Sequence, residues 1–281
     1  MKARLLSIPL ALGLASCDAS SEGSDPEFRI AFDVRANGDS FRCGGSYDGI
    51  GVANTTVEPL DIRLYVHDVH LVTASGGEVP LDLSADQTWQ RDGVALLDFA
   101  DDTGRCATGS PQTNMEIVGT ADVDEDVVGV SFTLGLPTES NHIDAVRSPA
   151  PFNAPGMWWS WTGGFKYARI DVATPTHPAW FLHLGATSCE GSPAEGIECA
   201  WTNVPRIELS GMDPQTDTVV LELGSLYADS DLDAPIDYES DFINGCMAFS
   251  GDPECAPIFE RLGVEFEGER TFEQQAFTAE P

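Results

Sequence analysis

Positive charge is scarce in this sequence. Its 281 residues include 14 Lys and Arg against 46 Asp and Glu, which gives a formal net charge of -32 at pH 7. A surface of this sign repels phosphate backbones and anionic lipid headgroups, so the composition argues against nucleic-acid binding. It favours cations and basic partners instead. The hydrophobic content of 42% is enough for one large core or two modest ones.

The motifs of common enzyme classes are missing as well. The sequence contains no GxSxG, HExxH, GxxxxGK[ST] or complete GxGxxG pattern, and no CxxC pair. Two acidic runs, at 122–126 and 229–233, have the alternating Asp of calcium loops. The second run lacks the glycine and the final acidic ligand of an EF-hand, so we interpret both as solvated loops. We expect a binding protein rather than an enzyme.

The apolar run near the N-terminus is too short to span a membrane. Lys2 and Arg4 precede the run at 5–14, and small residues then lead into Cys17. This arrangement resembles a bacterial lipobox, so we predict a lipoprotein signal peptide over 1–17, with Cys17 lipidated. The polar, acidic segment 18–27 would be a flexible tether. The protein would then lie in the periplasm or at the cell surface, lipid-anchored to a bacterial membrane. An ordinary signal peptide with an incidental cysteine is the alternative.

Cysteine is sparse, and its count is informative. Without Cys17, six cysteines remain, an even number that predicts three disulfides in an exported chain. Many pairings are possible, but short-range closure favours Cys189 with Cys199 and Cys246 with Cys255. Cys43 and Cys106 are then left for each other. The six cysteines interpreted as structural are Cys43, Cys106, Cys189, Cys199, Cys246 and Cys255.

Helical patterns are rare, and strand-like alternation dominates. Only 256–264 predicts a helix, a turn or two that begins after Pro257. We predict an all-β fold, a single antiparallel β-sandwich-like domain over 28–266 with disulfide-stapled loops, followed by a loose acidic tail over 267–281. The alternating segments, separated by Gly, Pro, Asp and Asn clusters, are 28–36, 60–72, 127–136, 165–173, 180–186 and 218–226.

Three of the six tryptophans lie in the short segment 157–161. In a strand, Ser160 would place Trp159 and Trp161 on the same face. Aromatic runs in β-sandwiches are ordinarily core, which is the simplest interpretation of this segment. A second interpretation is a surface carbohydrate-binding or interaction module, whose exposed tryptophans stack on sugars with no histidine nearby.

Histidines are few, and they are the best metal ligands available. His67 and His70 are three residues apart, so a regular strand would point them to opposite faces and only one could serve a given site. His142 lies in a turn-like segment, and His183 lies mid-strand between apolar neighbours. His177 lies in a loop, where we expect it to be exposed. Two or three converging imidazoles would suit copper or zinc.

Several segments together resemble one known family. They include "RLYVHDVHLV", "ALLDFADDTGRC", "FTLGLPTESNHID", "MWWSWTGGFKYARID", "FLHLGATSC" and "GCMAFSGDPECAPIFERLG". The chain from Phe28 to Gly263 is similar to the metallo-mystery-pair, four-Cys-motif family of MbnP-like proteins. The resemblance implies a mostly β, periplasmic or surface copper-binding protein that acts in copper acquisition or handling. It also implies a partner, a di-haem oxidase similar to MauG and cytochrome c peroxidase, which oxidises a tryptophan to kynurenine.

The resemblance also assigns site residues. Trp159 and Trp161 match the tryptophan pair of the family and are the two candidates for oxidation, whereas Trp158 stands where other aromatic residues also occur. The family is implied to use the resulting kynurenine, together with histidines, to form its copper site. The resemblance does not decide which tryptophan is modified.

The implied ligands are three histidines and one methionine. His67, His142 and His183 match histidine positions of the family, and Met157 is a possible soft ligand if the metal is Cu(I). His70 falls where the family has arginine, so we give it little weight. Because many members of the family occur in organisms without methanobactin, the resemblance does not imply transport of that molecule.

Overall fold

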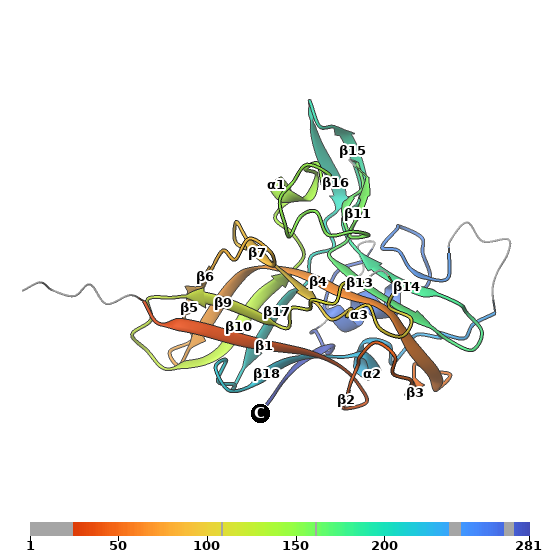
Figure 1. Ribbon diagram of the computed structural model, residues 1–281, viewed down its shortest axis with the longest axis horizontal. Coiled ribbons are helices and arrows are strands. Elements are labelled where there is room, and N and C mark those ends of the chain that lie inside the picture. The colour runs from red at the N-terminus through yellow and green to blue at the C-terminus, as the bar shows by residue number, and fades with distance from the viewer. Residues whose placement is uncertain (1–24, 108, 161, 236–242, 267–272) are drawn as a thin grey trace, which may run out of the picture.

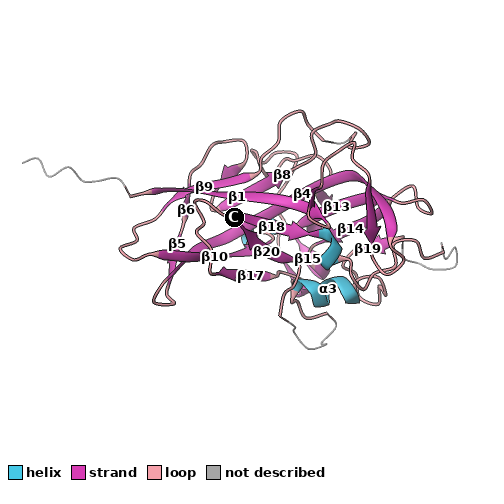
Figure 2. Ribbon diagram, turned by 90° about the horizontal axis from the view of Figure 1, so that it is seen from below, coloured by secondary structure: helices cyan, strands magenta, loops and turns pink. Residues whose placement is uncertain are grey.

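The computed structural model describes residues 25–107, 109–160, 162–235, 243–266 and 273–281. Cys17 and Trp161 lie outside the described residues. Within these ranges, no helix has the length and apolar character that a membrane span requires. Strands dominate, and only three short helices are present among the described residues (Figure 2).

Two packed sheets contain most of the strand residues (Figure 1). The first has the order β20-β18-β1-β9-β6, and β2 also pairs with β1. Its strands β1 and β18 run parallel, and the other pairs are antiparallel. The strands of this sheet are β1 (Glu27–Ala36), β2 (Asp39–Ser40), β6 (Asp82–Leu83), β9 (Glu116–Thr120), β18 (Thr218–Glu222) and β20 (Phe277–Glu280).

The second sheet has the order β17-β10-β4-β13-β14-β19, with β3, β5 and β8 also paired to β4, and β7 to β8. Only β14 and β19 are parallel among its described pairs. The strands are β3 (Tyr47–Ile50), β4 (Thr55–Thr73), β5 (Glu78–Pro80), β7 (Gln90–Arg91), β8 (Val94–Asp98), β10 (Val127–Leu134), β13 (Ala168–Ala173), β14 (Trp180–Leu184), β17 (Arg206–Ser210) and β19 (Gly245–Cys246). The prediction of an all-β, sandwich-like domain is confirmed.

Two small hairpins lie outside these sheets. One joins β11 (Trp158–Ser160) to β12 (Gly164–Phe165), and the other joins β15 (Thr187–Ser192) to β16 (Gly196–Trp201). Figure 1 shows the β15–β16 hairpin projecting from the sandwich, with α1 (Thr138–Asn141) and β11 near its base. These elements surround the candidate site.

Strand β4 is long and is buried along most of its length because neighbours flank and cover it. It contains a β-bulge where Asp68 has a φ of 51°. Across the bulge, His67 pairs with Thr133 and His70 pairs with Ser131. Since alternate residues of β10 share a face, the bulge brings both histidines to that same face. The expectation of opposite faces, which assumed a regular strand, is therefore wrong.

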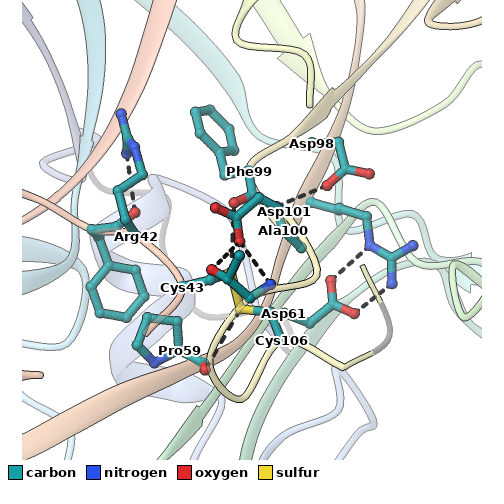
Figure 3. The surroundings of a disulfide bond; sticks show 12 residues. Arg42, Cys43, Pro59, Asp61, Asp98, Phe99, Ala100, Asp101 and Cys106 are labelled. Atoms are coloured by element: carbon teal, nitrogen blue, oxygen red, sulfur yellow. Dashed lines mark hydrogen bonds and ion pairs between the residues drawn. A yellow bond between two sulfur atoms is a disulfide. The ribbon is translucent and has the colours of Figure 1, made fainter. Parts of the chain in front are cut away.

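All three disulfides form as short-range closure favoured. Cys189 pairs with Cys199, Cys246 with Cys255, and the remaining Cys43 with Cys106. Figure 3 shows the Cys43–Cys106 bridge beside the buried Asp61 and Asp98. This bridge joins segments that are 63 residues apart, whereas the other two close short loops.

The end of the chain differs from the prediction. The loose tail predicted over 267–281 is wrong for residues 277–280, which form β20 and pair with β18, because Phe277 is buried against Phe132 in the core. The strand predicted over 218–226 stops at Glu222, whose carboxylate caps the short helix α2 (Leu223–Leu226). The predicted C-terminal helix is present as α3 (Ala256–Leu262) and ends at Gly263 in the left-handed conformation.

Candidate metal centre

A ladder of buried charges crosses one face of β4, β13 and β14. Arg63 donates to Asp61, with 2.7 Å between Nε and Oδ1. Arg169 lies between two carboxylates, with Nη1 2.9 Å from Asp61 Oδ2 and Nε 2.7 Å from Asp171 Oδ2. Asp171 accepts a further hydrogen bond from His183 Nε2 at 2.8 Å. Cross-strand pairing places these groups side by side, since Arg169 is opposite both Arg63 and His183.

His183 is held in a single tautomer at the end of the ladder. A carboxylate can only accept, so Nε2 carries the proton and Nδ1 keeps its lone pair. Nδ1 is buried and has no hydrogen-bond partner among the described residues. Burial lowers the pKa of His183 below its ordinary value, although the hydrogen bond to Asp171 acts in the opposite direction. The site therefore offers a neutral imidazole whose buried lone pair is unused.

Trp159 lies next to His183. Its ring centroid is 6.4 Å from that of the imidazole, and its other neighbour is Phe249, which stacks on it at 6.2 Å with an interplanar angle of 29°. The indole Nε1 is buried without a hydrogen-bond partner in the described part of the chain. Phe249 is 46% exposed, so one aromatic ring separates Trp159 from solvent on that side.

Two glycines allow this arrangement. A Cβ on Gly185 would lie 2.6 Å from Cζ3 of Trp159, so the indole occupies the space that a side chain would fill. Gly156 has a φ of 78°, and a Cβ there would lie 2.4 Å from Nη1 of Arg169. The loop before β11 therefore packs directly against Arg169 of the charge ladder. The strand that follows places Trp159 against Gly185, at the end of β14.

A separate cavity contains the other two predicted histidines. It has a volume of about 440 Å³, and its lining includes His67, His142, Tyr167 and Cys199. Nε2 of His142 lies 3.4 Å from Sγ of Cys199. His67 donates from Nδ1 to the carbonyl of Gly135 at 3.0 Å, and burial lowers the pKa of His67. His67 and His142 thus share one cavity.

The structure does not bring all four predicted ligands together. His183 is not part of the lining of the cavity that holds His67 and His142. Met157 is fully buried in the hydrophobic core, and its backbone pairs with Lys166. Trp158 packs against that core as well.

The prediction of an exposed His177 is wrong. His177 is only 2% exposed, and its Nε2 lies 2.7 Å from the carbonyl oxygen of Ala234. The local Thr-His-Pro sequence carries no sign of this contact, because Ala234 lies 57 residues further along the chain.

Asp171, Gly185 and Phe249 were not identified from the sequence. A signal for Asp171 was present, since Arg169 and Asp171 alternate with apolar residues in a strand that proves to be buried on both faces. Charges at such positions require partners, which identifies them as part of a buried network. Phe249 lies in an irregular segment far from Trp159 in sequence, where no local pattern indicates the stacking.

The fold and site define a disulfide-stapled β-sandwich protein with a histidine–tryptophan site. The chain belongs to the MbnP family, whose family model matches residues 25–248. Among solved structures it is similar to MbnP from Methylosinus trichosporium, with 27% sequence identity and a TM-score of 0.81, covering 92% of this chain and 99% of that chain. No curated protein sequence gives a significant match. The predicted resemblance is confirmed.

Proposed function

We propose that this protein binds copper as Cu(I) at the site formed by His183 and Trp159, and acts in copper acquisition or handling. The observation that carries the proposal is the buried Nδ1 of His183, which lacks a partner among the described residues while Asp171 holds Nε2. A carboxylate–histidine pair of this kind fixes the tautomer and increases the basicity of a metal-ligating nitrogen. Neutral imidazole is a suitable ligand for copper.

The residues present fit a soft metal once Trp159 is modified. Indole nitrogen offers only an N–H donor, so unmodified Trp159 supplies no strong ligand. Kynurenine carries an aromatic amine and a ketone, either of which can bind a metal or one of its ligands. The 6.4 Å between the ring centroids places the two side chains in contact, so that groups on the modified ring and His183 Nδ1 could bind the same cation. We therefore assign Trp159 as the oxidised residue.

The oxidation needs a partner with a strong oxidant, for which we propose the di-haem enzyme implied by the family resemblance. The C2–C3 bond of the indole breaks, and each of these carbons gains an oxygen from water, a four-electron oxidation that leaves N-formylkynurenine. The haem groups of the partner would accept the four electrons and pass them to two molecules of peroxide, which are reduced to water. Hydrolysis then releases the formyl carbon as formate and leaves kynurenine. Phe249 supplies a short aromatic path from Trp159 to the surface.

We also propose that the protein is exported and anchored to a membrane by a lipid. The lipobox-like sequence ending at Cys17 supports a lipid-anchored protein of the periplasm or cell surface. Three disulfides are consistent with an oxidising compartment. Neither point depends on the histidine–tryptophan site.

The sugar-binding alternative has less support. It requires exposed tryptophan rings without a histidine nearby, whereas Trp159 is half-buried, stacked beneath Phe249 and adjacent to His183.

Peptide mapping of the protein purified from its native source tests the proposal. We expect a mass gain of a few daltons, for one carbon lost and one oxygen gained net, on the peptide that contains Trp159. We also expect one Cu(I) per modified chain. An unmodified Trp159 in protein co-produced with a neighbouring di-haem oxidase, or modification confined to Trp161, would contradict the assignment.

A further inference from the structure

A second group of soft ligands lies away from Trp159. Single ligand atoms of His142, Cys189 and Cys199 all lie within 4.8 Å of one another. Nε2 of His142 is 3.4 Å from Sγ of Cys199. In the folded protein the two sulfurs form a disulfide across the β15–β16 hairpin, where the two cysteines are directly opposite each other.

A hydrogen bond from Asn141 determines which ring nitrogen of His142 is unprotonated. Oδ1 of Asn141 accepts a hydrogen bond from the backbone N–H of Phe165 at 2.9 Å. Its Nδ2, which can only donate, is therefore directed at Nε2 of His142, 3.2 Å away. Nε2 is then the unprotonated nitrogen, and the same nitrogen approaches Cys199, so a cation bound there would replace the Asn141 N–H at this lone pair. His142 is thus held in the tautomer that a metal ligand needs.

His67 lines the same cavity and has the same tautomer as His142. Its Nδ1 donates to the Gly135 carbonyl, so Nε2 carries the lone pair. The cavity, about 440 Å³ in volume, is lined by His67, His142 and Cys199, so it gives a cation space beside the sulfur.

The Cys189–Cys199 bridge is also the most accessible of the three disulfides. Both of its cysteines are partly exposed, whereas Cys106 and both cysteines of the third bridge are fully buried. The hairpin that carries it forms its own two-stranded sheet and projects from the sandwich (Figure 1). Its loop is short, so opening the bridge releases little chain entropy compared with the Cys43–Cys106 bridge.

We propose that this bridge is the closed form of a second, redox-controlled site for a soft cation such as Cu⁺ or Cd²⁺. A dithiol or phosphine reductant transfers two electrons to the disulfide, the S–S bond breaks, and two thiols form while the reductant is oxidised. On binding, both thiols release their protons, and the two thiolates and Nε2 of His142 hold the cation. Soft thiolate with imidazole is a ligand set that Cu⁺ and Cd²⁺ accept. The site uses neither Trp159 nor His183, so it is independent of the proposed function.

Cd²⁺ is a suitable probe, because a thiolate-to-Cd²⁺ charge-transfer band in the ultraviolet arises only when sulfur binds the metal. The full chain is treated with limiting phosphine, desalted without oxygen and titrated with Cd²⁺. Alkylation and mass mapping identify the thiols. We expect Cys189 and Cys199 to be reduced first, and one Cd²⁺ to bind per chain with the band. The oxidised protein should show no band.

Variants test whether the Cd²⁺ is bound by Cys189, Cys199 and His142 rather than elsewhere on the protein. His142→Ala should weaken Cd²⁺ binding at least about tenfold, and His142→Gln serves if the alanine variant does not fold. His70→Ala is the matched control, since His70 does not line the cavity, and should bind as the parent does. The Trp159→Phe variant should still show the thiolate-to-Cd²⁺ charge-transfer band. The double variant Cys189→Ser with Cys199→Ser should not show it. Resistance of the bridge to reduction in folded protein, or equal affinity with and without His142, would overturn the proposal.

Discussion

The indole of Trp159 and the imidazole of His183 lie side by side, with ring centroids 6.4 Å apart and the Cα of Gly185 beneath the indole. Each ring has one buried nitrogen without a partner among the described residues. Polar atoms of this kind are rare in folded proteins and usually have a functional reason. Here the reason we propose is a metal ligand that forms after oxidation of the indole.

Replacing Trp159 should abolish tight copper binding with little effect on folding. Trp159→Phe keeps an aromatic ring over Gly185 but cannot form kynurenine, so we expect no small mass gain and a loss of Cu(I) retention in a competition assay with a Cu(I) chelator. Trp158→Phe is the control, because Trp158 packs against the core. Normal copper binding by the Trp159 variant would show that this indole is not part of the site.

Removing the charge on Asp171 should weaken copper binding without removing the ligand. Asp171→Asn replaces a charged acceptor by a neutral one, so it holds the Nε2–H tautomer of His183 less strongly, and changes of this type reduce metal affinity by about 10–100-fold. Asp33→Asn is the matched control, because Asp33 is also a buried carboxylate paired with arginine but lies on β1. Equal Cu(I) affinities for the two variants would contradict a role for Asp171 in orienting the ligand.

The contribution of Asp98 to the stability of the protein should decrease between about pH 4 and about pH 6. Burial raises the pKa of Asp98 from 3.8 to about 6. A raised pKa means that the folded state holds this proton more tightly than the unfolded chain, so stability is lost as the pH rises through this window. The loss is ~2–3 kcal/mol, since one pKa unit corresponds to ~1.4 kcal/mol.

Urea unfolding at several pH values measures this effect. Asp98→Asn can keep the hydrogen bond from the Ala100 N–H and should remove this contribution, so its stability relative to the parent should increase between about pH 4 and about pH 6 and stay constant above about pH 6. Asp39→Asn, at an exposed carboxylate, should follow the parent at each pH. If the difference between Asp98→Asn and the parent does not depend on pH, the folded pKa of Asp98 is not raised.

Adding a methyl group at Gly185 should displace Trp159. The new Cβ would meet the indole at 2.6 Å and the carbonyl of Phe165 at 2.8 Å, so Gly185→Ala should cost ~1–3 kcal/mol and lower the yield of modified protein. Gly77→Ala, whose Cβ would meet only the Thr73 and Ser75 side chains, is the control. Thermal unfolding and peptide mass measurements report the two effects, and an unchanged yield would place the oxidised residue elsewhere.

The C-terminal strand should contribute strongly to stability. Phe277→Ala removes a buried ring that lies 5.6 Å from Phe132, which we expect to cost ~3–5 kcal/mol. Thr278→Ala, on the exposed side of β20, should cost less than ~0.5 kcal/mol. Similar midpoints for the two variants in denaturant would mean that β20 is not docked as described.

Strands with strong alternation could be predicted because alternation is a local property. β1 shows it, since exposed and buried residues alternate from Glu27 to Phe32. The short-range disulfides were also predictable, since two cysteines about ten residues apart close a hairpin easily. The bulge at Asp68 was not predictable in this way, because it depends on how β10 pairs with β4.

The site could be predicted only in part for the same reason. His183 and Trp159 were each identified, but their contact depends on the fold-back of β11 onto the end of β14. The hydrogen bond between Asp171 and His183 likewise depends on strand pairing between segments that show no relation in sequence. His142 was grouped with His183, whereas the structure places it beside a disulfide.

Strand β4 and the β15–β16 hairpin should differ in how readily their backbone hydrogen bonds open. The 19 residues of β4 contribute Asp61 and Arg63 to the charge ladder and His67 to the cavity, while β10, β13 and β8 hold β4 by backbone pairing. Amide hydrogens at these positions should exchange only through global unfolding, whereas those of the β15–β16 hairpin exchange through local opening. The cavity wall formed by His67 is therefore expected to be rigid, whereas the hairpin wall that carries Cys199 can adjust its position to a cation bound there.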